Sequence, residues 1–184
     1  MMTGFVRFNI NLCLAVALLA ATGCHSTKSE DGKKKENKKD LALVELHLEV
    51  TPDELTDTKT IAVNRREPFT VVVDKDSFVD TTYISGARLL EEGTDVFSIQ
   101  LKFNWSGTMR LDTTTTAHRG KHIAVNCTFG KAHTTRWVAA LVIRKRIADG
   151  TLTFTPDATH EEAEEIVRGL NHSAEKMKKD DIKW

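Results

Sequence analysis

The sequence predicts an α+β fold with two layers, in which a mainly antiparallel sheet has helices packed on one face. Short segments of alternating or β-branched residues follow one another with turn residues between them, as in hairpins. Two segments carry helical signals instead: residues 105–118 and an amphipathic stretch that begins near Thr159. Neighbouring strands that pair, with helices covering the sheet, are typical of a two-layer α+β domain.

The first strands are predicted at residues 41–50, 61–63 and 69–73. Apolar and polar residues alternate over 41–50, so one face of this strand is expected to be buried. Residues 69–73 are rich in valine and threonine, which favour strands. Over residues 76–86 the apolar positions stand three to five apart, which predicts a short helix or helical turn that ends at Gly86.

A hairpin follows, with arms at residues 87–92 and 95–103 and a turn at Gly93 and Thr94. The second arm alternates cleanly between apolar and polar positions, as a strand with one buried face should.

A helix is predicted over residues 105–118, with Asn104 as its N-cap and Gly120 as its C-terminal stop. The segment contains four consecutive threonines, which lose side-chain freedom in a helix. The helix is therefore expected to depend on Met109 and Leu111 packing against the sheet.

The second half of the domain continues with strands at residues 122–128, 136–143 and 151–155. A last helix begins with a capping box formed by Thr159 and Glu162. Its apolar residues recur every three or four positions and predict one buried stripe: Ala163, Ile166, Val167, Leu170, Ala174 and Met177.

The N-terminus is typical of a bacterial lipoprotein signal peptide, expected over residues 1–23. Arg7 precedes an apolar run over residues 12–21, which is too short to span a bilayer. Residues 19–24 resemble a lipobox, which implies that Cys24 becomes the lipidated N-terminal residue, carrying diacylglycerol and palmitate. An ordinary secretory signal with a coincidental cysteine is the alternative.

Residues 24–40 contain no large apolar side chain and are expected to be a disordered, lysine- and glutamate-rich tether. Residues 41–178 then have the length of one domain, followed by a polar tail at 179–184. Basic and acidic residues balance at 26 each over the whole chain, which gives no support to a nucleic-acid partner.

No pattern of catalytic, cofactor-binding or metal-ligating residues is recognisable, so the domain is expected to be non-enzymatic and to hold no cofactor or metal. The seven histidines include no HExxH motif. His118 and His122 straddle a predicted turn, and His160 and His172 lie too far apart on the last helix to form a ligand pair. The glutamates at 161, 162, 164 and 165 complement the helix dipole at the start of a helix.

Three further features are expected to be structural. Cys127, alone in the mature chain, is predicted to be a buried strand residue. The basic run 144–146 ends a strand and either keeps that edge soluble or marks a contact for acidic partners. Trp105, Trp137 and Tyr83 are scattered, so core packing is expected rather than a binding platform.

From Phe69 to Leu170 the ordered set of these signals resembles the head part of the first periplasmic domain of SecD and SecDF, accessory subunits of the Sec protein-export machinery. The matching segments are 84–87, 96–107, 120–125 and 147–155, together with 161–163. The sequence departs from the family pattern at Leu141, where a proline is usual, and at 129–131, where an Asp-Gly turn is usual.

The resemblance implies a SecD-like head fold and handling of exported polypeptide, but not proton-driven translocation, because the transmembrane helices of SecD have no counterpart in this sequence. One functional hypothesis is a non-catalytic envelope lipoprotein, anchored through Cys24 and facing the periplasm, that contacts exported polypeptide or Sec subunits through a sheet edge or groove. The alternative is a structural adaptor for another envelope protein, and a third is an enzyme acting on an envelope substrate.

Overall fold

The structure, a computed structural model, describes residues 41–52, 57–91, 93 and 96–181. The expected signal peptide, Cys24 and the tether lie outside these residues. In chain order the elements are β1 (Leu43–Leu48), β2 (Thr58–Val63), β3 (Phe69–Asp74), β4 (Val79–Asp80), the 3₁₀ turn η2 (Thr81–Tyr83), β5 (Ile84–Glu91), β6 (Phe97–Phe103), α1 (Trp105–Ala117), β7 (His122–Phe129), β8 (Thr134–Val142), β9 (Thr151–Phe154) and α2 (His160–Asp181).

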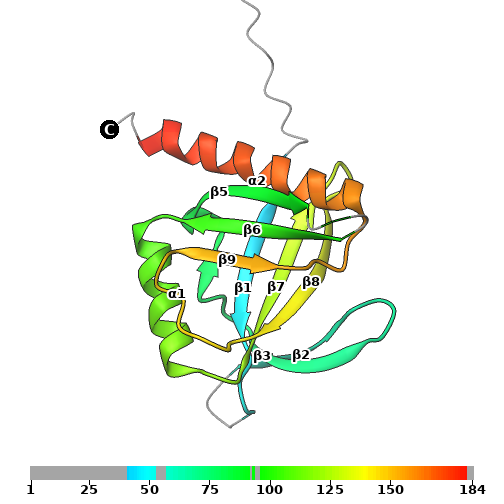
Figure 1. The fold of residues 1–184 in the computed structure, drawn as a ribbon, viewed down its shortest axis with the longest axis vertical. Helices are drawn as coiled ribbons and strands as arrows, with labels where there is room; N and C mark the ends of the chain where they lie inside the picture. The colour runs from blue at the N-terminus through cyan, green and yellow to red at the C-terminus, as the bar shows by residue number, and fades with distance from the viewer. Residues whose placement is uncertain (1–40, 53–56, 92, 94–95, 182–184) are drawn as a thin grey trace, which may run out of the picture. The chain divides into compact units, whose positions relative to one another are not determined.

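Two antiparallel sheets face each other across one core (Figure 1). One sheet has the strand order β4-β1-β7-β8, and the other has the order β5-β6-β9. Their inward side chains are fully buried, among them Leu46 of β1, Val125 of β7 and Leu101 of β6. The α+β class and the antiparallel pairing are confirmed, and the structure adds that the strands are divided between facing sheets.

The hairpin of β2 and β3 forms a separate two-stranded arm on the outer face of the four-stranded sheet. Ile61 and Val73 of the arm are buried there against Ala124 of β7, with Trp137 and Ala140 of β8 packed around them. This second, smaller apolar cluster explains why alanine and tryptophan stand at outward-facing positions of the sheet.

The helix α2 begins and packs as its sequence predicts. Thr159 and Glu162 form the capping box, with the Glu162 N–H donating to Thr159 Oγ1 at 3.2 Å and the Thr159 N–H donating to Glu162 Oε2 at 2.8 Å. Ile166 and Leu170 are fully buried, and the helix contacts strands of both sheets. It extends to Asp181, so it includes the first residues of the expected polar tail.

One side chain of α2 completes the outer edge of β5. Asn171 Oδ1 accepts the Ala87 N–H at 2.8 Å, and Asn171 Nδ2 donates to the Ala87 carbonyl at 2.9 Å. The amide thus bonds to the β5 backbone as a neighbouring strand would, so this edge is covered.

The helix α1 has the predicted N-cap, because Asn104 Oδ1 accepts the Gly107 N–H at 2.9 Å. Its buried side is formed by Gly107, Leu111 and Thr115. The prediction that Met109 packs against the sheet is wrong, since it is 47% exposed. Gly107, Leu111 and Thr115 stand four positions apart and form the buried stripe of the helix, so Met109, two positions before Leu111, lies on the outer side.

The helix predicted over residues 76–86 is also wrong in its extent. Asp80 pairs with Glu45 of β1, so the segment first adds the short strand β4 to the sheet. Only Thr81–Tyr83 is helical, and Gly86 lies inside β5. Pairing with a strand more than thirty positions earlier overrides the local spacing, while the other predicted strands are confirmed within a few residues.

Candidate functional site

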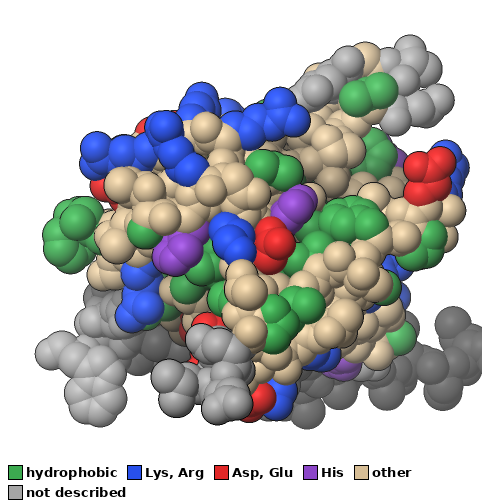
Figure 2. Space-filling view, turned by 90° about the horizontal axis from the view of Figure 1, so that it is seen from below, with side chains coloured by type: hydrophobic (Ala, Val, Ile, Leu, Met, Phe, Trp, Pro, Cys, Tyr) green, Lys and Arg blue, Asp and Glu red, His purple; other side chains and the backbone are tan. Residues whose placement is uncertain are grey.

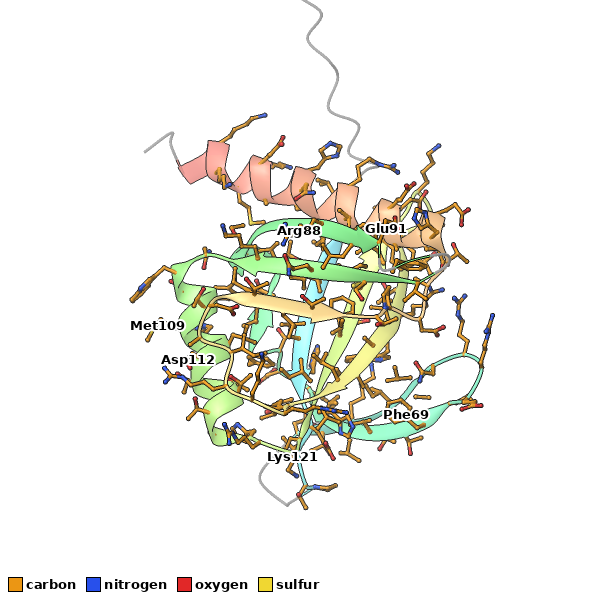
Figure 3. The ribbon with its side chains drawn as sticks, in the orientation of Figure 1. Phe69, Arg88, Glu91, Met109, Asp112 and Lys121 are labelled. Carbon is orange, nitrogen blue, oxygen red and sulfur yellow. The ribbon has the colours of Figure 1, made fainter. Side chains whose placement is uncertain are left out.

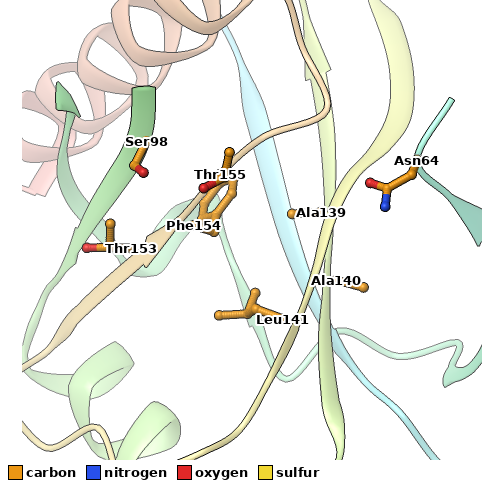
Figure 4. Close-up of a pocket in the computed structure, with 8 residues that line it drawn as sticks. All are labelled: Asn64, Ser98, Ala139, Ala140, Leu141, Thr153, Phe154 and Thr155. Carbon is orange, nitrogen blue, oxygen red and sulfur yellow. The ribbon is translucent and has the colours of Figure 1, made fainter. Parts of the chain in front are cut away.

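A pocket of about 510 Å³ lies between the edge strand β8 of one sheet and the edge strand β9 of the other (Figure 4). Strand residues form most of its lining: Ser98, Ala139, Ala140, Leu141, Thr153 and Phe154, with Thr155 and Asn64 beyond the strands. We call this feature the edge groove.

The two edges meet at one end of the edge groove. The Asp157 N–H, just after β9, donates to the Val138 carbonyl of β8 at 2.6 Å. Away from this bond the groove is lined by residues 139–141 on one side and by residues 155–153 on the other, so the residue numbers rise along β8 and fall along β9 as the two strands diverge. The groove is therefore a wedge with a closed vertex.

Backbone groups of both strands point into this wedge. The Ile143 N–H bonds back to the Lys121 carbonyl beside β7, and antiparallel strands alternate the direction of their backbone groups, so those of Ala140 point away from β7. Likewise, Gly150 bonds to Phe103 beside β6, so Thr153 directs its groups away from β6. Among the residues that the structure describes, no strand pairs with these groups.

The edge groove lacks the usual protection of a sheet edge. Residues 137–142 of β8 and Ile143, which follows the strand, contain no charged side chain and no proline, whereas natural edges are commonly blunted by lysine, proline or a covering segment. Ala139 and Ala140 also have small side chains, which leave the strand backbone accessible from the groove. The strand is thus suited in shape and chemistry to accept an additional strand.

An ion-pair cluster holds the closed end. Arg136 of β8 donates to both carboxylate oxygens of Glu162, at 3.0 and 2.7 Å, and to the Asp157 carbonyl at 3.0 Å. Arg65, at the end of the arm, donates its N–H to Asp157 Oδ2 at 2.9 Å. The hydrogen bonds from Arg136 lower the pKa of Glu162, and this effect exceeds the opposing effect of burial.

The lining of the edge groove is rich in groups that form hydrogen bonds. Its lining supplies backbone groups, hydroxyls and an amide, which suit hydrogen bonding to an extended segment. Cys127 is buried as predicted, and burial raises the pKa of its thiol to about 12, so it is not a nucleophile at neutral pH. Over the described ranges, no group of three or more His, Cys, Asp or Glu is arranged to hold a metal ion.

The histidines considered as ligand pairs make separate contacts. His122 Nδ1 lies 2.6 Å from Glu49 Oε2, and His160 Nε2 lies 2.8 Å from Glu91 Oε1. The hydrogen bond that His160 donates to the Glu91 carboxylate raises the pKa of His160. His118 contacts the end of α1, and His172 is exposed on α2.

The aromatic residues have three different surroundings. Trp137 is half-buried between His47 and Lys59, and Tyr83 is half-buried under Arg110. The expectation that Trp105 packs in the core is wrong, because it is 79% exposed.

A sheet edge or groove is the binding feature that the sequence predicts, but the residues that form it are not predicted. The uncharged run over 137–143 was the available signal, and it predicts a strand equally well in the middle of a sheet. Only the pairing order places it at an edge.

No protein-family model matches this sequence, and no curated protein matches it. No helix in the described part of the chain is both long and apolar enough to cross a membrane.

Solved structures of SecDF do resemble the domain. The first, of SecDF as a membrane component that enhances protein export, matches with a TM-score of 0.50 and 18% identity over 72% of this chain and 63% of that chain. SecDF in a super-membrane-facing form gives 0.49 and 18% over 71% and 18% of the two chains. Translocon-associated SecDF from Thermus thermophilus gives 0.39 and 14% over 73% and 30%.

This chain therefore spans less than two thirds of the SecDF structures that it matches. The likeness concerns the fold, since identity is 18% or lower. The described domain has a fold like that of the periplasmic part of SecD and SecDF.

Proposed function

We propose that this protein is a non-catalytic accessory lipoprotein of the cell envelope, which binds extended segments of exported polypeptide in the edge groove. The unprotected pair of edges at β8 and β9 carries this proposal. A guest segment would add a strand, satisfy the backbone groups of Ala140 and Thr153, and join the two sheets. Backbone pairing depends little on sequence, as a site for varied exported chains requires.

The sequence and the likeness in fold together support a cellular location for this activity. A lipid on Cys24 would hold the domain at a membrane on the periplasmic side. The likeness to SecDF, described as a membrane component that enhances protein export, supports a place beside the Sec machinery. The Sec translocon and chains in transit are the proposed partners.

A photoreactive residue at Thr153 tests the proposal in the native host. Thr153 lines the groove and is exposed, so a bound strand lies within reach of it. We expect cross-links to several exported proteins in transit. Recovery of one folded envelope protein, with neither exported chains nor Sec subunits, would favour the adaptor hypothesis and contradict this one.

Two substitutions at Ala140 isolate the backbone contribution. Both changes replace the alanine methyl group, but they differ at the backbone. Ala140→Pro removes the N–H that points into the groove, whereas Ala140→Gly keeps this N–H. The one lost hydrogen bond is worth about 0.5–1.5 kcal/mol, so we expect the proline variant to lose up to about tenfold in affinity for an unfolded, reduced polypeptide, and the glycine variant to lose little. Equal binding by both variants would exclude strand addition at β8.

A further inference from the structure

The outer side of α1 presents two large apolar side chains to solvent. Trp105 is 79% exposed and Met109 is 47% exposed. They stand four residues apart on one helix and so lie on the same side of it. Met109 projects away from the body of the domain in Figure 3. Neither side chain contributes to the core, although tryptophan is highly buried on average in folded proteins.

The segment between β8 and β9 runs beside this helix and is fixed to it. Arg146 forms a two-pronged ion pair with Asp112 of α1, whose second contact measures 2.7 Å. The Ile147 N–H donates to Thr115 Oγ1 at 2.9 Å. The helix and the segment therefore present one continuous surface.

This surface is basic. Arg110, Arg144 and Lys145 are all exposed. The acidic side chains beside them are engaged, since Asp112 pairs with the arginine described above and Asp149 accepts a backbone N–H at the start of β9 at 3.1 Å. Figure 2 shows Lys and Arg side chains gathered at its upper left, on the side of the molecule where α1 lies in Figure 1.

We propose that the α1 face, formed by Trp105, Met109, Arg110, Arg144 and Lys145, docks onto an anionic lipid bilayer. Tryptophan prefers the boundary between headgroups and acyl chains. Exposed arginine and lysine are attracted to anionic headgroups. Apolar side chains that project among cations match a bilayer surface better than a folded acidic protein, which would need a cavity to receive the tryptophan.

The proposal rests on the proposed lipid anchor in one respect, which is the local concentration that the anchor provides. Residues 25–40 reach at most about 55 Å when extended, so a domain tethered at Cys24 stays beside the bilayer. Short tethers give effective concentrations of about 1 mM, at which a surface with only two apolar side chains and a few cations is sufficient. Docking would then fix which side of the domain faces the membrane.

Tryptophan quenching tests the docking. The full chain, purified from membranes, is reconstituted into phosphatidylethanolamine and phosphatidylglycerol vesicles whose acyl chains carry bromine. A docked α1 face would bring Trp105 close to the brominated acyl chains, so we expect stronger quenching of the wild type than of Trp105→Ser. The difference between the two reports Trp105 alone. The double change of Arg144→Ser and Lys145→Ser should weaken docking about fivefold for each basic side chain removed. Vesicles without anionic lipid should give a similar loss.

Controls separate docking from other effects. Val96→Ser removes an apolar side chain that is 49% exposed at the opposite end of β6 from α1, and it should leave quenching unchanged. Ala140→Pro should also leave it unchanged, so failure of the edge-groove proposal remains distinguishable. Equal quenching of the wild type and Trp105→Ser would overturn the proposal. So would photo-cross-links from position 109 in native membranes that reach only protein.

Discussion

The edges of β5 and of β8 are treated differently in this domain. The β5 edge is covered by α2, whose Asn171 bonds to both backbone groups of Ala87. The β8 edge faces a pocket, and its only described backbone bond on that side is the one from Asp157 at the vertex. The same domain therefore closes one edge with a helix and leaves another without the usual protection, which indicates that the open edge is not simply a failure of packing.

The largest expected difference between the α2 side and the edge-groove side is in how much a buried leucine contributes to the free energy of unfolding. Leu170→Ala empties a fully buried site under α2 and should cost about 2–5 kcal/mol of unfolding free energy. Leu141→Ala, at the half-buried wall of the edge groove, should cost distinctly less, about 1–2 kcal/mol. Urea unfolding of both variants measures this difference. Equal costs would mean that the groove side is packed as tightly as the α2 side.

A proline at matched edge positions sharpens the comparison. Ala87→Pro removes the N–H that bonds to Asn171, so the amide oxygen loses its donor. Ala140→Pro removes an N–H without a described strand partner. We expect the first change to lower the unfolding free energy by about 1–3 kcal/mol more than the second. A larger cost at Ala140 would contradict the assigned backbone direction.

The ion pair at the vertex adds a pH dependence. Its hydrogen bonds from Arg136 lower the pKa of Glu162 from 4.5, so its stabilising effect is present above that value and is lost as pH falls through the lower, folded-state pKa. Glu162→Gln keeps the capping box but removes the charge. The variant should be less stable by about 1 kcal/mol near neutral pH, and this difference should shrink in acid below about pH 4. Denaturation across that range measures it.

The smallest expected effect is measured on the protein without any substitution, by comparing amide hydrogen exchange at the two edges. Amide hydrogen exchange should be slower at Ala87, whose N–H is bonded to Asn171, than at Ala140, whose N–H points into the groove. Addition of an unfolded polypeptide should slow exchange at Ala140 and leave Ala87 unchanged. Protection of both amides in the free protein would indicate that the groove is already filled.

Local patterns were sufficient for much of the fold and insufficient for the site. The capping box and apolar stripe of α2, and the alternation of β6, are properties of consecutive residues and were predicted correctly. Residues 76–86 were assigned wrongly because β4 exists only through its pairing with β1. Met109 and Trp105 were misplaced because the buried side of α1 is formed by Gly107, Leu111 and Thr115. At Gly107 the helix lies so close to Tyr83 that a Cβ there would stand 2.8 Å from Tyr83 Cβ.

The edge groove could not be predicted from local patterns either, because it depends on pairing between strands that are far apart in the sequence. An uncharged strand is expected both at the centre of a sheet and at a functional edge. Whether β8 has one neighbour or two depends on where β9 lies, and β9 pairs with β6, some fifty positions earlier in the chain. The role of Asn171 is equally hidden, because its partner Ala87 is 84 positions away.

The opposite course of β8 and β9 from their shared vertex has a consequence for what the groove would recognise. A segment lying between them must run parallel to one strand and antiparallel to the other, whichever end enters first. Reversing the segment exchanges the two kinds of pairing but preserves their number. The wedge would therefore offer one parallel and one antiparallel edge to a guest of either polarity, so either arm of a looped chain could enter it.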